Sequence, residues 1–394
     1  MPAPDAEHIG ARIAWYRKLR QKTQLELADL ANCSYSTITK VEQGVRPATP
    51  GIVAAVARAL SVQTTDLTGQ PYLTELQQDE LDGLIQPIRE TLDLYDLGVD
   101  PDVAPRGVPA LAAEADQLCA LVRDGRLKDA ARALPDLITE ATTAAHTART
   151  SEAWGVLAST YRTAYDVCTK LGYPDLCVVA LDRLDWAAER ASDPVLAGMR
   201  QYLRSLVYLR AGQYHMGRRL VTVGMATLAQ GEPGRVRDVV TGQLHLGAAV
   251  LAARAGDGDT AAGHIAEAAR AADATGEATR VHWLSFGPTN VATHRVSVLT
   301  EQCQYGEALE AAAGLTIPAD WPASRVAAHL AEVARAQLWT GRTDQAEQTL
   351  QRAREVAPQQ TRYQPMVRET IASLLSARRS TPGTLANLAH WVGI

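Results

Sequence analysis

Glycine-containing turns recur along this chain from about residue 110 onward, each after a long stretch rich in Ala and Leu. Successive glycines are 47, 40, 44, 50 and 35 residues apart, and each interval holds roughly two helices. Glycine adopts the left-handed conformation that often ends a helix without steric cost. The turns contain Gly125, Gly172, Gly212, Gly256, Gly306 and Gly341. This periodicity predicts an all-α chain in which about six helical hairpins stack side by side.

The composition agrees with a helical fold. Aromatic residues make up only 5% of the 394 residues, and Phe286 is the single phenylalanine. Helices of Ala, Leu, Arg, Glu and Gln need no aromatic core. The stretches AGQYHMGRR, AGDGDTAAGHIAEA and TGRTDQAEQTLQRAREVAP resemble degenerate tetratricopeptide repeats. This resemblance implies that residues 110–394 form an α-solenoid of tetratricopeptide-like helical hairpins.

A different pattern occupies residues 23–44, TQLELADLANCSYSTITKVEQG. Thr23 and Glu26 form a T-x-x-E capping box, which starts a helix at the next residue. Asn32 follows where the chain must turn, and asparagine tolerates the left-handed conformation. Ser34 can then cap a second helix. The sequence therefore predicts two short helices joined by a tight turn.

The outward face of the second helix carries Tyr35, Ser36, Thr37, Thr39 and Lys40, without a carboxylate. Hydroxyl and ammonium groups can reach base edges and phosphates, and no acidic group would repel the duplex. An ordinary hairpin with a solvated polar face is the alternative. The capped entry and the acid-free face favour DNA binding.

Residues 9–67 resemble the lambda-repressor-like (XRE) helix-turn-helix domain. The Thr23-Gln24 pair and the E-x-G signature at Glu42–Gly44 carry the resemblance, although Gln21 and Asn32 stand where this family often has glycine. We therefore expect a five-helix DNA-binding domain over residues 1–70. Lys40 and Arg46 should contact phosphates, while Ser36, Thr37 and Thr39 should face bases. The full set expected to contact DNA is Gln24, Ser34, Tyr35, Ser36, Thr37, Thr39, Lys40 and Arg46.

The charge distribution supports this assignment. Residues 9–60 hold eight Lys or Arg and three Asp or Glu, whereas residues 71–394 hold 31 basic and 38 acidic residues. Basic charge is placed where phosphate would be met, and the remainder is unsuited to nonspecific nucleic-acid binding.

Residues 71–109 are expected to connect the two domains. A helix with apolar spacing runs through the first half and should be kinked or divided at Pro87. Pro, Gly and Asp in residues 98–109 mark the second boundary. Because one helix-turn-helix domain covers only half of a DNA site, we expect a homodimer on a near-palindromic double-stranded operator. The connector helix is a candidate for the dimer seam.

An unusual element, FGPTN, spans residues 286–290. Pro288 should start a helix, on which Asn290 and His294 share one face. The element is either a ligand site or a structural corner with a satisfied asparagine. It also recurs in a group of actinobacterial regulators that the chain resembles. In architecture the chain is similar to peptide-pheromone-responsive regulators of Gram-positive bacteria. That likeness implies a sensor for a peptide or small molecule, and the expected ligand-binding residues are Arg204, Gln243, Asn290 and His294.

Other functions find little support. The chain has no catalytic motif, its nine histidines are dispersed and its five cysteines are scattered. We therefore expect no enzyme activity, cofactor or metal site. The start lacks the features of a signal peptide and no apolar run could span a bilayer, so we expect a cytoplasmic protein without membrane partners. These features favour a dimeric, signal-sensing transcriptional regulator; the alternatives are a DNA-tethered protein-interaction scaffold and an antitoxin-like module.

Overall fold

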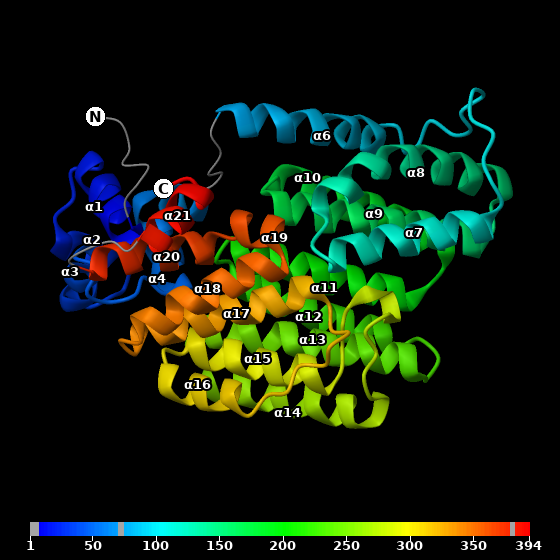
Figure 1. Ribbon diagram of the computed structural model, residues 1–394. Coiled ribbons are helices and arrows are strands. Elements are labelled where there is room, and N and C mark those ends of the chain that lie inside the picture. Colours follow the sequence, from blue (N-terminus) through cyan, green and yellow to red (C-terminus); the bar gives the residue numbers. More distant parts are fainter. Residues whose placement is uncertain (1–7, 70–74, 379–382) are drawn as a thin grey trace.

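The computed structural model describes residues 8–69, 75–378 and 383–394. Within these ranges the regular elements are helices, and the only β-type contact is an isolated bridge between Ala278 and Phe286. The expected all-α fold is confirmed. In Figure 1 a small group of helices lies at one end, beside a larger stack of paired helices. No helix of the described ranges is both long and apolar enough to cross a membrane.

Five short helices form the N-terminal domain, which we call the reader. They are α1 (Ile9–Leu19), α2 (Gln24–Leu30), α3 (Tyr35–Glu42), α4 (Pro50–Leu60) and α5 (Thr64–Thr68). Their apolar faces close a core of their own, in which Ile13, Leu27, Ile38, Val56 and Leu67 have no exposed surface. The reader therefore has the core that an independent small domain requires.

Local sequence explains the reader's turns. The capping box is present: the Thr23 hydroxyl accepts from the Glu26 N–H, and the Glu26 carboxylate accepts from the Thr23 N–H at 2.7 Å. Gln21 (φ 53°) and Asn32 (φ 51°) both adopt the left-handed conformation. These are the two positions where the family often has glycine, so polar residues here perform the same turn.

Six hairpins follow and form the stack that we call the solenoid. They pair α7 (Val108–Arg123) with α8 (Leu127–Ala148), α9 (Ser151–Leu171) with α10 (Pro174–Ala191), α11 (Pro194–Arg210) with α12 (Tyr214–Leu228), α13 (Arg235–Arg254) with α14 (Gly258–Thr275), α15 (Pro288–Glu301) with α16 (Tyr305–Ala313), and α17 (Ala323–Trp339) with α18 (Thr343–Val356). A short 3₁₀ helix, η1 (Val281–Trp283), precedes α15. Five of the six predicted glycines stand in the hairpin turns with positive φ; they are Gly125, Gly172, Gly212, Gly256 and Gly341.

The fifth hairpin turns at a different residue from the one expected. Gly306 lies inside α16, and Cys303 takes the left-handed conformation in the turn (φ 62°). The turn predicted at Gly306 therefore lies three residues earlier, at Cys303. The physical requirement was the backbone angle, which a cysteine meets here.

The segment expected to connect the domains is part of the solenoid. It forms α6 (Glu75–Asp93), which continues through Pro87 without being divided there. Its buried residues Leu81, Ile85, Ile88 and Leu92 belong to the same core as α8 and α9. From Leu81 to Leu92, the apolar face of α6 is thus covered by its own chain.

The solenoid curls until its last helices touch its first. After α18 come α19 (Pro358–Tyr363), α20 (Pro365–Ala377) and α21 (Gly383–Val392). Helix α19 contacts α9, and α17 contacts α7. The N–H of Lys128, at the start of α8, donates to Gln359 at 2.9 Å. The inner face of the solenoid is therefore enclosed by helices that are far apart in the sequence.

The reader docks on two distant parts of the solenoid. At α20, both carboxylate oxygens of Glu369 accept from the N–H of Ile9 at 3.2 Å. At the turn between α11 and α12, Arg58 donates to the carbonyl of Gly212 at 3.3 Å. Ala54 packs so closely there that a Cβ on Gly212 would lie 2.2 Å from its own. In Figure 1, α20 lies beside the reader.

Candidate nucleic-acid interface

Helix α3 presents one polar face to solvent because its other face is anchored in the reader core. Ile38 and Val41 are buried. The Ser34 hydroxyl caps the helix by accepting from the N–H of Thr37 at 3.1 Å. A capped helix with a fixed inner face holds its outer side chains in a defined direction.

Most residues expected to contact DNA lie on this outer surface. Ser34, Ser36, Lys40 and Arg46 are exposed, and half of the Tyr35 surface is accessible (52%). Gln24 and Thr39 are half-buried. The hydroxyl and amide groups therefore lie near the N-terminal ends of α2 and α3, while Lys40 lies in the last turn of α3 and Arg46 follows that helix.

Thr37 is an exception, and the expectation that it faces outward is wrong. It retains only 8% of its surface. Its hydroxyl lies 2.9 Å from that of Ser34 and accepts from Arg46 at 2.8 Å. Arg46 comes from the loop after α3, so this contact could not be seen in the helical spacing. Thr37 fixes the helix and holds Arg46 in place.

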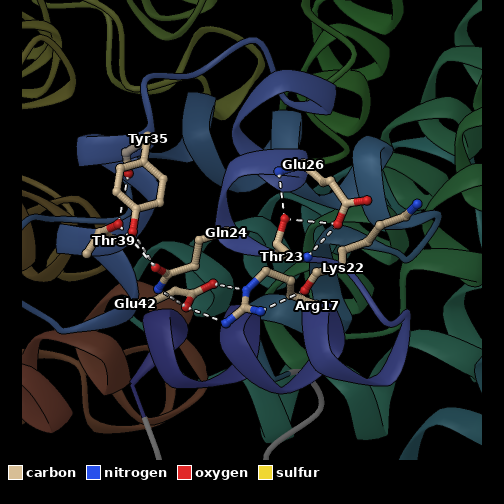
Figure 2. A network of polar contacts seen from close by, with 8 residues as sticks. All are labelled: Arg17, Lys22, Thr23, Gln24, Glu26, Tyr35, Thr39 and Glu42. Atoms are coloured by element: carbon tan, nitrogen blue, oxygen red, sulfur yellow. Dashed lines mark hydrogen bonds and ion pairs between the residues drawn. The ribbon is translucent and has the colours of Figure 1, made fainter.

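Gln24 is held by an ion pair beneath it (Figure 2). The Glu42 carboxylate accepts from Arg17 Nε at 2.7 Å and Nη2 at 2.9 Å, and from Gln24 Nε2 at 2.7 Å. Both charged side chains are largely buried, at 11% and 6% exposure. The hydrogen bond to Glu42 raises the pKa of Arg17. Bidentate pairing of this kind restricts both partners.

The other end of the Gln24 amide faces α3. Its Oε1 accepts from the Tyr35 hydroxyl at 3.4 Å and lies 3.3 Å from Thr39 Oγ1. Figure 2 shows these groups side by side. Gln24 thus links α2 to α3 and is pre-positioned at the surface. The role of Arg17 cannot be predicted from its local sequence, since nothing there indicates a partner 25 residues away.

Three of the four residues expected to bind a ligand meet inside the solenoid. Asn290 donates to Gln243 Oε1 at 3.2 Å and accepts from Arg325, and Gln243 donates to Tyr202 at 2.7 Å. His294 Nδ1 lies 2.8 Å from the carbonyl of Asn290. Burial, reinforced by Arg325, lowers the pKa of His294 to about 3, which keeps it neutral.

This cluster is closed. Asn290 has no exposed surface and Gln243 retains 2%, so these two residues do not line an open surface of the solenoid. Their amides satisfy one another because buried polar groups require partners. Arg204 stands apart and donates to Gln201 at 3.3 Å.

The FGPTN element has the geometry of a structural corner. Pro288 begins α15, as expected. Phe286 is fully buried, and a Cβ on Gly242 would lie 2.1 Å from its ring. The Glu277 carboxylate accepts from the N–H of Thr289 at 2.8 Å and closes the helix entry. These contacts favour the structural alternative.

Comparisons with known proteins concern mainly the reader. Residues 13–67 match the helix-turn-helix family, so the N-terminal segment is an XRE-type helix-turn-helix domain. The chain is 35% identical over 72 residues to an immunity repressor protein of Bacillus phage phi105. That match covers 18% of this chain and 50% of the repressor, so the chain spans about half the length of this relative. The matching family is a helix-turn-helix family, and the matching relative is a repressor.

One solved structure aligns over more of the chain. It is Bacillus thuringiensis PlcR in complex with the peptide PapR7 and DNA, at 12% sequence identity. The alignment covers 78% of this chain and 94% of that one, with a TM-score of 0.34. Across the described part of the chain, no three His, Cys, Asp or Glu side chains form a group that could hold a metal ion.

Proposed function

We propose that this protein is a sequence-specific DNA-binding transcriptional regulator whose solenoid senses a small-molecule or peptide signal. The observation that carries the proposal is the outer face of α3. It places Ser34, Tyr35, Ser36 and Lys40 at the surface of a helix-turn-helix domain, next to the fixed amide of Gln24.

The geometry suits insertion into a major groove. Hydroxyl groups on the first turn of a recognition helix can reach base edges, and cations at its ends can reach phosphates. Docking on the solenoid does not consume this face, because the reader's polar contacts with it come from Ile9, Arg12, Arg58 and Thr64, which lie outside α3. DNA and solenoid can therefore be bound together.

We further propose a homodimer on a near-palindromic operator in the cytoplasm. A single reader contacts only half a site, and two linked readers gain affinity from each other. The closed solenoid supports a sensing role, since it encloses an inner surface and touches the reader at two points. A ligand that prefers one arrangement of these contacts would change the population of DNA-competent molecules.

Genome-wide mapping of bound sites, followed by binding assays on a mapped operator, tests the proposal. Lys40→Ala should weaken binding to all sequences and make the salt dependence shallower by about one charge. Arg352→Ala removes an exposed positive charge from α18 and should change neither quantity. If Lys40→Ala kept full affinity for random DNA and lost only the operator, the phosphate role would be wrong.

A second test measures the sequence preference of DNA binding. Ser36→Ala should relax specificity and cost about 1–3 kcal/mol on the operator, as expected for a lost base contact. Thr37→Ala should instead reduce the stability of the reader, because its hydroxyl bonds Ser34 and Arg46. Operator binding that is unaffected by every substitution on α3, or a protein that binds no genomic site, would contradict the proposed function.

A further inference from the structure

A cavity of about 780 Å³ lies between the reader and the inner face of the solenoid. The reader contributes Ile9, Val53 and Thr65 to its wall. Lys170 from α9 and Arg210 from α11 line the solenoid side, and Met366 of α20 lines the remaining side. The reader, the inner helices of the solenoid and α20 therefore all line one cavity. A change in how the reader docks would change the shape of this cavity.

Most charges in the cavity wall are already paired. Arg254 and Arg335 both donate to Glu301, at 3.2 and 3.1 Å, and Arg335 also bonds Glu332 at 3.4 Å. Glu369 is occupied by the N–H of Ile9. These groups form a nearly neutral network, which leaves two cations of the wall to be accounted for.

Lys170 and Arg210 bond neutral acceptors only. Lys170 Nζ donates to Gln360 Oε1 at 2.6 Å. Arg210 Nη1 donates to the Tyr165 hydroxyl at 3.3 Å and to the carbonyl of Leu206 at 3.2 Å. Neither forms an ion pair with any carboxylate of the described ranges. Lys170 is half-buried and Arg210 is exposed, so two cations without a counter-charge leave this side of the cavity positively charged.

The surroundings of Lys170 increase this positive charge. Arg123 from α7, Arg210 from α11 and Arg325 from α17 act on it together with Asp166. Asp166 is itself bonded to Arg123 at 2.9 Å. Burial, and next the charge of Arg123, lowers the pKa of Lys170 to about 7. The missing component is negative charge.

We propose that this cavity binds an organic anion whose carboxylate or phosphate head group is held by Lys170 and Arg210. Leu338, Trp339 and Met366 in the same wall would cover an apolar body. Hydrogen bonds from cationic donors to such head groups are charge-assisted and stronger than neutral ones. The inference rests on the proposed sensing function and specifies its ligand class. It places the signal where it touches reader and solenoid together.

Calorimetric titration of the full-length protein tests the site. The probes are hexanoate, hexyl phosphate and acetyl-dileucine with a free carboxylate, and neutral hexanamide is the matched control. If the dipeptide binds more tightly than hexanoate, the natural anion is assigned to a peptide. If hexanoate binds more tightly than the dipeptide, it is assigned to a small organic acid. Either result supports the site, provided that hexanamide binds at least about tenfold more weakly than the best anion.

Variants locate the anion. Lys170→Gln and Arg210→Gln should each weaken binding at least about tenfold, while Lys170→Arg keeps the charge and should retain it. Arg219→Gln, at an exposed position of α12 outside the cavity, should bind as wild type does. Hexanoate affinity should fall about tenfold or more from pH 6.5 to 8.5, because the anion requires charged Lys170 and its pKa is about 7.

Three results would overturn the site: no anionic probe binds, hexanamide binds equally well, or the Lys170 and Arg210 variants bind as wild type does. Binding of the same preparations to a mapped operator separates this inference from the proposed function. Operator binding without anion binding would remove the site and leave the regulator. If the anion binds in a manner that depends on Lys170 but the protein binds no operator, the site stands and the proposed regulator function is removed.

Discussion

Glu369 joins the reader to the C-terminal helices, and its replacement by glutamine should stabilise the protein at neutral pH. The carboxylate accepts from the N–H of Ile9 at 3.2 Å and lies 3.5 Å from Arg12. Burial opposes ionisation more strongly than these two contacts favour it, and raises the pKa of Glu369 from 4.5 to about 6. Glutamine keeps an acceptor for Ile9 and carries no charge.

The magnitude follows from proton linkage. Because the folded protein holds this proton more tightly than the unfolded chain, the stabilisation is complete below pH 4.5 and is lost as the pH rises through 6. The loss at pH 7.5 is about 2 kcal/mol, since one pKa unit corresponds to about 1.4 kcal/mol. Glu369→Gln should therefore exceed wild type by about 2 kcal/mol at pH 7.5, and by less than about 1 kcal/mol at pH 5.0.

Equilibrium urea unfolding at the two pH values measures this difference. Glu355→Gln removes an exposed carboxylate from α18 and should change neither value. The reasoning would be refuted if Glu369→Gln were less stable than wild type at pH 7.5. It would also be refuted if the gain were equal at both pH values, because proton linkage could not then be its source.

Three further outcomes test the reader and the solenoid. Thr23→Ala should cost about 0.5–2 kcal/mol of reader stability in thermal unfolding, through the lost cap; an unchanged melting temperature would contradict the capping box. Asn290→Ala should cost about 1–3 kcal/mol in urea unfolding, because Gln243 and Arg325 lose a buried partner; normal stability with a lost signal response would restore Asn290 as a ligand residue. A fragment ending at Gly69 should fold by circular dichroism on its own core but bind the operator weakly; full affinity of the fragment would argue against cooperation between two readers.

Local signals in the sequence predicted several helix starts and hairpin turns. The capping box at Thr23, the Ser34 cap and the proline at the start of α15 each act through backbone groups within four residues. Five of the six glycine turns were found for the same reason. Cys303 shows the limit of this signal, since glycine is sufficient for a left-handed turn but not necessary.

The site was harder to predict because its geometry depends on distant partners. The orientation of Thr37 is decided by Arg46, and that of Gln24 by Glu42, 18 residues away. Asn290 has the correct neighbours for a ligand site, yet its partners Gln243 and Arg325 consume its hydrogen bonds. Spacing shows which residues share a face, and tertiary contacts decide whether that face is open.

The cavity was beyond prediction for a related reason. Lys170 meets Gln360 across 190 residues, and it does so only because the solenoid closes on itself. Closure depends on small crossing angles summed over many helix pairs, which no single segment encodes.

The two docking points of the reader lie at α20 and at the turn between α11 and α12, which come from opposite arms of the closed solenoid. The reader therefore bridges two separate parts of the solenoid. A change in the curvature of the solenoid must either rotate the reader or break one of these two contacts. Such coupling is reciprocal: if the proposed signal changes the affinity for DNA by some factor, DNA must change the affinity for that signal by the same factor. A molecule seated on its operator would then meet the signal with a different affinity from one still searching the chromosome.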